Sequence, residues 1–513
     1  MNPARRLFTL ALASAWTAKL PVAWATQAND ASSLKSDLSL LNRISWGISK
    51  DDFQRLRAEG RDAFLARQLK PDLRVSLPEA SRRHLASLEL INRPAEQRLA
   101  GYLEREARMQ KMPRGEKRMA EGRRLRQEVL RAADQSAQRA VIYAIHSPNQ
   151  LNEAMTWFWL NHFSVYRSVR LTGLLVPELE AAAIRPRALG RFQDLLTAVV
   201  YSPAMLSYLD NVRNYRGSSN ENYARELMEL HTLGVDGGYT QKDVQELARV
   251  LTGFTIDDPV SRKAAERNPG SRPPVKNGVQ VFYPSLHDDA PKKLLGKEIR
   301  QAGPEGLTEA LDILCGHPAT ATFISRKMAT YFLPTTPSDS LTDKLARRFA
   351  QSGGDIAQVL GALFDSEEFQ LSLAQGKFKD PVHYVLSAVR LRMHAAPAIQ
   401  DAEPILRVLV QANQGYYGRP TPDGYPLMQA EWSGSGQMAA RLQLARSLAM
   451  DGPQGIYGDT LEGKQQPISL NDAFFKDSLH VLFGSKTLDV LKGAKTAREW
   501  NTYLLASPEF MYR

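Results

Sequence analysis

The sequence predicts an all-α protein, a multi-helix array with a small β-hairpin or irregular excursion around residues 256–300. Apolar residues recur at intervals of three and four along most of the chain, which is typical of amphipathic helices. Strand-like alternation is scarce and is clearest at residues 279–283. The chain has 513 residues, of which 43% are hydrophobic and 24% charged. This composition supports a folded core and argues against disorder.

The first 25 residues are typical of a signal peptide. Arg5 and Arg6 precede a moderately apolar run over residues 7–18, and Ala23-Trp24-Ala25 supplies small residues for cleavage before Thr26. The arginine pair resembles the twin-arginine export signal, although leaders of the general secretion route also carry such pairs. We therefore expect a periplasmic or secreted protein. No later stretch is long and apolar enough for a membrane span, so none is expected in the mature chain.

The chain carries a formal net charge of +11, and three positive residues of the leader account for part of it, which leaves +8. This mild excess favours an ordinary basic surface over a dedicated site for nucleic acid, anionic lipid or acidic polysaccharide. No nucleic-acid partner is expected. Cys315 is the single cysteine, which excludes an intramolecular disulfide. Its place near the end of an amphipathic segment favours a small buried side chain over a nucleophile.

Beyond the leader, we expect N-terminal helices over 26–136, a helical core over 137–450 and a helical tail over 451–513. In the first part, residues 101–135 predict two polar helices broken near Pro113-Arg114-Gly115. Acidic residues are interspersed among the basic ones, which favours a solvated hairpin over a nucleic-acid patch.

The core begins with a segment at 140–165 that is apolar on every side around Met155–Leu160, which predicts a central helix buried all round. The apolar spacing predicts further helices, separated by the excursion, at about 189–210, 219–233, 241–252, 306–316, 318–333, 340–352 and 355–365. Residues 380–450 are expected to be helical apart from a Gly/Pro-rich segment at 413–426.

The segment 218–253 reads as a helix, a tight glycine connector and a second helix. Ser218 with Glu221, and Thr240 with Asp243, have the spacing of a capping box at a helix start. On a helical wheel, His231 falls on a different side from Glu229, which argues against the Glu-x-x-His pattern of di-iron bundles.

Six residues are the candidates for chemistry. We expect a common cleft to gather Arg225, Glu226 and Glu229 of the first helix, Asp243 of the second, and His162 and His287 at its border. Two carboxylates on one helix face can hold a divalent metal or act as an acid/base pair.

Simpler interpretations stay open for the same residues. Arg225 and Glu229 can form an ordinary surface pair one helical turn apart. His162 can be a satisfied core histidine, and His287, beside Asp288, can lie in an exposed turn.

The stretch from Asn220 to Val235 resembles the signature of domain of unknown function 1800, and residues 239–244 and 248–254 continue it. Several further segments are similar to that family, and they include Arg43–Gly47, Trp159–Phe163, His287-Asp288, His317–Ala321 with Lys327, and Pro420–Pro426 with Trp432. The resemblance spans roughly residues 38–505. Asn413–Tyr417 departs from the Gly-Gln-Pro run associated with the last segment.

The resemblance implies an exported bacterial protein, often encoded beside a secreted family that resembles sulfatases and alkaline phosphatases. It supplies no established activity and names no cofactor, and a divalent metal stays open. Two classes of function stay open. One is a metal-dependent or acid/base enzyme acting on an extracellular polymer or envelope component. The other is a non-catalytic binding partner or maturation factor for a co-exported sulfatase-like protein.

Overall fold

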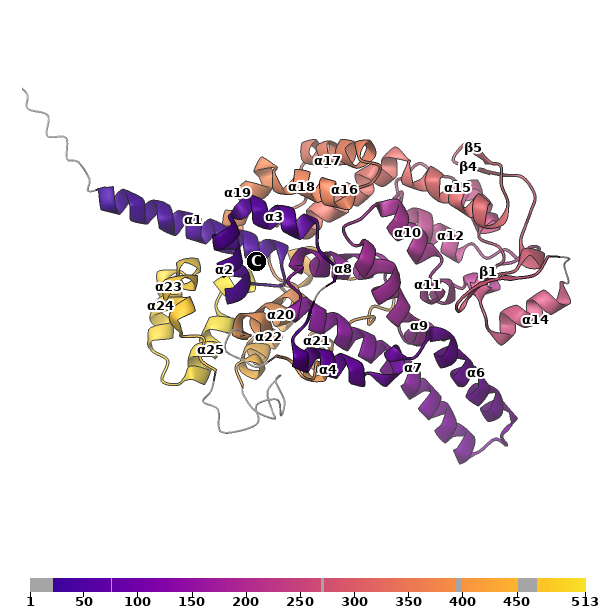
Figure 1. Ribbon diagram of the computed structural model, residues 1–513, viewed down its shortest axis with the longest axis horizontal. Coiled ribbons are helices and arrows are strands. Elements are labelled where there is room, and N and C mark those ends of the chain that lie inside the picture. The colour runs from indigo at the N-terminus through magenta and orange to yellow at the C-terminus, as the bar shows by residue number, and fades with distance from the viewer. Residues whose placement is uncertain (1–21, 75, 269–271, 394–397, 451–467) are drawn as a thin grey trace, which may run out of the picture.

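The computed structural model describes residues 22–74, 76–268, 272–393, 398–450 and 468–513 (Figure 1). Most of these residues are helical, which confirms the all-α prediction. The first half of the chain forms α1 (Val22–Ile44), α2 (Lys50–Glu59), α3 (Arg61–Leu69), α4 (Glu79–Ser87), α5 (Glu89–Asn92), α6 (Ala95–Lys111), α7 (Glu116–His146), α8 (Gln150–His162), α9 (Thr172–Glu178), α10 (Phe192–Val200), α11 (Pro203–Tyr208), α12 (Asn222–Glu229) and α13 (Gln241–Val250). Residues 1–21 of the expected leader lie outside the described part, so export stays a prediction.

The second half of the chain is also built from helices. They are α14 (Pro259–Arg267), α15 (Gly303–Cys315), α16 (Pro318–Phe332), α17 (Asp339–Gln351), α18 (Ile356–Phe364), α19 (Glu367–Gln375), α20 (Pro381–Arg392), α21 (Glu403–Gln411), α22 (Ser435–Leu448), α23 (Ala473–Asp477), α24 (Ser485–Lys492) and α25 (Ala497–Ala506). No helix among the described residues is long and apolar enough to cross a membrane.

Helix α8 lies at the centre of the array, and all thirteen of its residues are buried. This confirms the helix predicted from apolar residues on every side. The indole of Trp159 donates to the carbonyl oxygen of Ala188 at 2.9 Å, so this polar atom is satisfied inside the core. One continuous apolar cluster runs from Leu38 to Met511 around this helix, and α7 passes residue 136 without a break.

The excursion at 256–300 contains short strands, as predicted, and is more regular than a loop. Strands β1 (Phe254–Ile256), β3 (Gln280–Phe282) and β2 (Val275–Asn277) form an antiparallel sheet in that order, with Phe254 opposite Phe282. Strands β4 (Lys292–Leu294) and β5 (Lys297–Ile299) form a separate hairpin. Both sheets and α14 lie at the end of the molecule opposite α23–α25 (Figure 1).

The two predicted capping boxes have different outcomes. Thr240 and Asp243 form the complete motif at the start of α13. The prediction at Ser218 is wrong, because α12 begins only at Asn222 and Ser218 pairs with Tyr215 in a β-bridge. The helix also ends at Glu229, four residues before its predicted end. Spacing alone cannot distinguish the two cases, because a cap forms only where the preceding chain has the right direction.

Buried cations donate to the last carbonyl groups of helices that lie far away in the sequence. Arg43, on α1, is fully buried and donates to Phe332 at the end of α16 (2.9 Å) and to Ser372 near the end of α19 (3.0 Å). Lys377 donates to Leu333, beside the first of these helix ends, at 2.7 Å. The final carbonyl groups of a helix lack intrahelical partners and carry partial negative charge, so a cation stabilises them.

Helix α20 provides two more such cations. Arg390 donates to Ile145, near the end of α7, at 2.6 Å, and Arg392 donates to Leu448 at the end of α22. The array is therefore held by charged side chains that join helix ends, in addition to its apolar core.

Replacing Arg43 with Met should lower the free energy of unfolding by about 3 kcal/mol or more. Several buried acceptors would lose their donor, and each unsatisfied group costs roughly 1–3 kcal/mol. Denaturant unfolding followed by circular dichroism measures the change. Arg347→Met, at an exposed position of α17, is the control and should change stability by less than about 0.5 kcal/mol. An Arg43 variant as stable as the control would contradict this role.

Candidate functional site

The predicted acidic face of α12 is present, and its charged residues are half-buried. Tyr223 and Leu227 on the opposite face are buried in the core. Arg225 donates to Glu221 at 3.0 Å and to Gln241 at 2.9 Å, so it does not pair with Glu229. Within the described residues, Glu226 and Glu229 form no ion pair. This face therefore carries two carboxylates whose charge is not neutralised by a contacting cation.

Asp243 has a structural role at the start of α13. One carboxylate oxygen accepts from the backbone and hydroxyl of Thr240, and the other accepts from the backbone of Leu295 at 2.7 Å. These hydrogen bonds hold the β4–β5 hairpin on α13. The contacts of Asp243 are with this hairpin and not with the acidic face of α12.

His287 is also held in a structural network, and it is buried rather than exposed in a turn. Its Nδ1 lies 2.8 Å from the carbonyl oxygen of Thr252, and its Nε2 accepts from the backbone of Gly303 at 2.9 Å. Burial lowers the pKa of His287, so the ring is neutral with its proton on Nδ1. Both nitrogen atoms are occupied, and no described contact connects His287 with His162.

His162, at the end of α8, faces a second histidine that the sequence analysis excluded from the site. The ring centroids of His162 and His231 lie 5.9 Å apart, and both residues are buried. Nε2 of His162 lies 3.1 Å from the carbonyl oxygen of His231. Nδ1 of His162 and both ring nitrogens of His231 have no hydrogen-bond partner within the described residues. Such unsatisfied buried atoms are uncommon and mark the place as unusual.

Lys327, on α16, lies beside this histidine pair. Burial and the charge of Lys327 lower the pKa of His231 to about 3 and also lower that of His162. Burial in turn lowers the pKa of Lys327 to about 8, while Asp423 opposes this shift. The ammonium group lies 5.7 Å from the ring centroid of Phe323 and forms no ion pair within the described residues. Lys327 is therefore a half-buried amine whose pKa lies well below the usual range of lysine.

A loop at residues 413–426 brings Asp423 to the same place. The loop is fixed on the end of α8, where Asn161 accepts from the backbone of Tyr425 at 2.6 Å and donates to its carbonyl oxygen at 2.8 Å. Gly424 has φ of +78°, and a Cβ atom there would lie 2.1 Å from the carbonyl oxygen of Asn161. Only glycine fits this approach, which explains the Asp-Gly pair at the tip of the loop.

The charge of Asp423 acts on both Glu226 and Lys327. Asp423 pairs with Arg419 at 2.9 Å, and although burial opposes it, the hydrogen bonds from Arg419 lower the pKa of Asp423. The same carboxylate acts on Lys327 and on Glu226. Burial, Glu229 and Asp423 raise the pKa of Glu226, while Arg225 opposes the rise. We call His162, His231, Glu226, Lys327 and Asp423 the Lys327 site.

A model of the family described as "Protein of unknown function (DUF1800)" matches residues 39–512, nearly the whole chain. The chain belongs to the DUF1800 family. This confirms the resemblance found in the sequence. No curated protein matches the DUF1800 chain. No solved structure matches it either. The site must therefore be interpreted from its own geometry.

The sequence analysis missed three members of the Lys327 site. His231 was placed away from Glu229 because α12 was expected to continue, but the helix ends at Glu229 and the chain turns. Lys327 and Asp423 lie in segments that resemble the family, yet nothing in their spacing indicates that they share a site. Their proximity depends on the packing of α16 and of the 413–426 loop.

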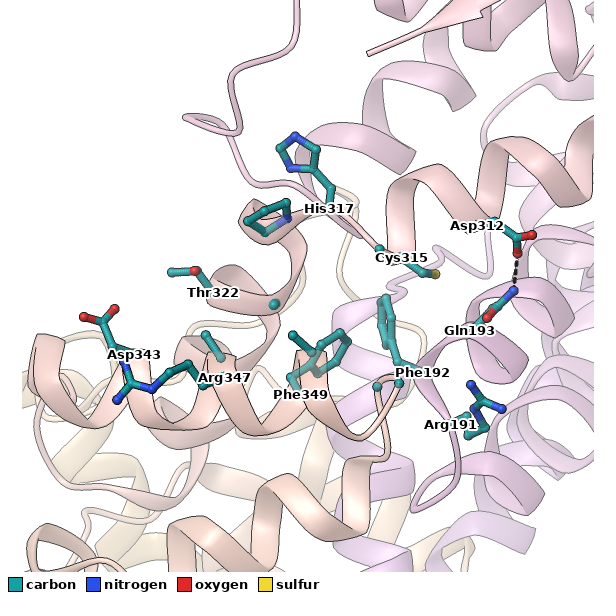
Figure 2. Close-up of a pocket in the computed structure, with 17 residues that line it drawn as sticks. Arg191, Phe192, Gln193, Asp312, Cys315, His317, Thr322, Asp343, Arg347 and Phe349 are labelled. Atoms are coloured by element: carbon teal, nitrogen blue, oxygen red, sulfur yellow. Dashed lines mark hydrogen bonds between the residues drawn. The ribbon is translucent and has the colours of Figure 1, made fainter. Parts of the chain in front are cut away.

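A separate cavity of about 550 Å³ lies beside α10, α15, α16 and α17 (Figure 2). Phe192, Phe349, Cys315 and His317 are among its lining residues. Burial, with Asp312 and Asp194, raises the pKa of the Cys315 thiol to about 12, so the thiol is protonated at neutral pH. His317 accepts from the backbone of Ala319 at 3.2 Å as the cap of α16. These two groups do not support catalysis in this cavity.

Within the described part of the chain, no group of three or more His, Cys, Asp or Glu side chains is arranged to hold a metal ion.

Lys327 should react with acetic anhydride unusually fast for a half-buried lysine, because its lowered pKa leaves more free amine at neutral pH. The labelling rate should rise with pH and level off above about 8. Quantitative mass spectrometry of tryptic peptides measures this rate, with exposed Lys344 as the internal comparison. A rate that keeps rising steeply to pH 10 would contradict the lowered pKa.

His287→Ala should destabilise the protein by about 2–4 kcal/mol, because the Gly303 amide and the Thr252 carbonyl would lose their buried partner. His317→Ala is the matched control, since that ring caps a half-buried helix start, and should cost roughly 1 kcal/mol. Thermal unfolding of both variants measures the difference. Equal losses would show that the His287 network is not a structural anchor.

Proposed function

We propose that the protein is an exported enzyme that transfers protons at the Lys327 site, with Glu226 as general base and Lys327 as general acid. One observation carries this proposal. The pKa of the Glu226 carboxyl group is raised and the pKa of the Lys327 amine is lowered to about 8, and the charge of Asp423 acts on both groups. Environments that displace two titratable groups in this way are typical of acid/base sites.

The ionisation states suit these roles near neutral pH. Above the raised pKa of Glu226 the carboxylate is ionised and can accept a proton. Below about pH 8 the Lys327 ammonium is charged and can donate one. His162 and His231 stay neutral in this range because burial lowers their pKa values. The two rings therefore add no charge that would compete with the transferred proton.

The leader supports action in the periplasm or outside the cell, on an extracellular polymer or envelope component as substrate. The twin-arginine route is part of the proposal, and Arg5→Lys with Arg6→Lys would block export by that route. A divalent metal at Glu226 and Glu229 is not assigned, because the proposed proton transfer uses the side chains of Glu226 and Lys327 directly.

A second candidate function is a non-catalytic partner or maturation factor for a co-exported sulfatase-like protein. The cavity of about 550 Å³ favours it, because apolar Phe192 and Phe349 with Arg191 and Arg347 can receive side chains of another protein. In that case the Lys327 site would be dispensable. A substitution in the cavity would then abolish function instead.

Incubation of the purified protein with isolated envelope material should release products that mass spectrometry detects. Release should rise with pH as Glu226 ionises and fall above about pH 8 as Lys327 loses its proton. Glu226→Gln and Lys327→Met should each reduce the rate by about 100-fold or more. Lys327→Arg should remove the fall near pH 8.

Lys344→Met is the control for loss of a lysine and should keep the full rate. Circular dichroism should show that all variants are folded. Unchanged product release by Lys327→Met would exclude this enzyme function. The partner function would gain support if that variant also kept binding to a sulfatase-like protein.

A further inference from the structure

The hairpin of α6 and α7 projects from the body of the protein as a two-helix arm (Figure 1). The predicted break near Pro113 is confirmed, because α6 ends at Lys111 and α7 begins at Glu116. We call residues 108–126 the hairpin tip. The tip lies at the far end of the arm and has little apolar core of its own, with Leu125 as its buried side chain.

The hairpin tip concentrates much of the positive charge of the chain. It contains eight basic and two acidic residues, a net charge of +6 when the whole chain carries +11. Arg108 and Arg124 form long ion pairs one helical turn away, with Glu104 at 3.7 Å and with Glu121 at 3.6 Å. The remaining basic residues form no ion pair within the described part of the chain, and they are Lys111, Arg114, Lys117, Arg118, Arg123 and Arg126. The acids of the tip therefore leave most of its charge unbalanced, although further acids are interspersed along the rest of the hairpin.

Two methionines stand among these basic residues. Met112 is 38% exposed and Met119 is 57% exposed, and both flank the turn of the hairpin. Met119 follows Lys117 and Arg118, and Met112 follows Lys111. Exposure of these apolar side chains to water is unfavourable. Their insertion between lipid chains lowers the free energy.

We propose that the hairpin tip docks onto an anionic membrane surface, with Met112 and Met119 inserted and the basic side chains on lipid phosphate groups. Lys and Arg suit this position because their alkyl stems lie along the apolar boundary while their charges stay at the headgroups. A soluble polyanion would be attracted by the charge alone and would leave both methionines exposed. The methionines therefore favour a membrane as the partner.

Co-sedimentation of the full chain with lipid vesicles tests this proposal. Vesicles of phosphatidylglycerol and phosphatidylcholine should bind the protein in a salt-sensitive manner, whereas phosphatidylcholine alone should not. The variant Arg114→Glu with Lys117→Glu should weaken binding to the anionic vesicles by roughly tenfold or more. The variant Met112→Ser with Met119→Ser should weaken binding at high salt, where attraction by charge is screened.

The control variant Lys344→Glu with Arg348→Glu makes the same change of charge at two exposed positions of α17. Neither residue forms an ion pair within the described residues. This variant should bind nearly as well as the unmodified chain. Failure of the unmodified chain to bind anionic vesicles would overturn the proposal. Equal losses of vesicle binding in the control and in the hairpin variant would overturn it too. The net charge of the whole protein, and not the hairpin tip, would then account for the binding.

Heparin and a short oligonucleotide serve as soluble polyanions in a parallel assay. Hairpin-dependent binding to either of these, with no binding to vesicles, would overturn the proposal of a membrane partner and would favour a soluble polyanion. An unchanged vesicle affinity in the methionine variant at high salt would overturn the insertion of the tip. All substituted side chains are exposed, so circular dichroism should show that all four proteins are equally folded.

Discussion

The structure depends on satisfying helix ends that are buried inside a large array. Each helix leaves its last carbonyl groups without an intrahelical partner, and inside a core no water can replace one. Arg43, Arg390 and Lys377 provide the donors from segments distant in sequence. Arg43 also donates to the carbonyl oxygen of Arg513 at 3.1 Å, which joins two segments 470 residues apart. This donor set explains why buried cations occur in this core without an equal number of buried acids.

The Lys327 site differs from these anchors in one respect. Lys377 is buried and donates to two carbonyl oxygens, so its charge serves the fold. Lys327 has the same kind of buried stem, yet its ammonium group meets an aromatic ring and a histidine pair instead of a helix end. The site thus combines a cation without a structural partner, neutral histidines and carboxylates without contacting cations. Unsatisfied polar groups of this kind destabilise a fold, so their retention is typical of function.

The hairpin tip and the body differ in the burial and pairing of their charged side chains. In the body, several cations are buried and donate to backbone carbonyl groups. In the hairpin tip, the basic side chains are mostly exposed and unpaired, and the apolar side chains beside them are exposed as well. The sequence favours a solvated hairpin with acids interspersed among the basic residues. Outside the tip, Glu128 pairs with Arg105, whereas the tip itself keeps an excess of basic charge.

Local sequence patterns determined the helices of this protein, the buried α8, the break at Pro113 and the capping box at Thr240, because each depends on residues a few positions apart. The same patterns placed Arg225, Glu226 and Glu229 on one helix face. Tertiary structure alone decided which distant groups meet that face. It assigned Asp243 and His287 to hydrogen-bond networks around the β-strands, and it brought His231, Lys327 and Asp423 together. The hydrogen bonds that join α8 to α16 and to the 413–426 loop connect residues 177 and 264 positions apart, and such long-range packing leaves no periodic trace in the sequence.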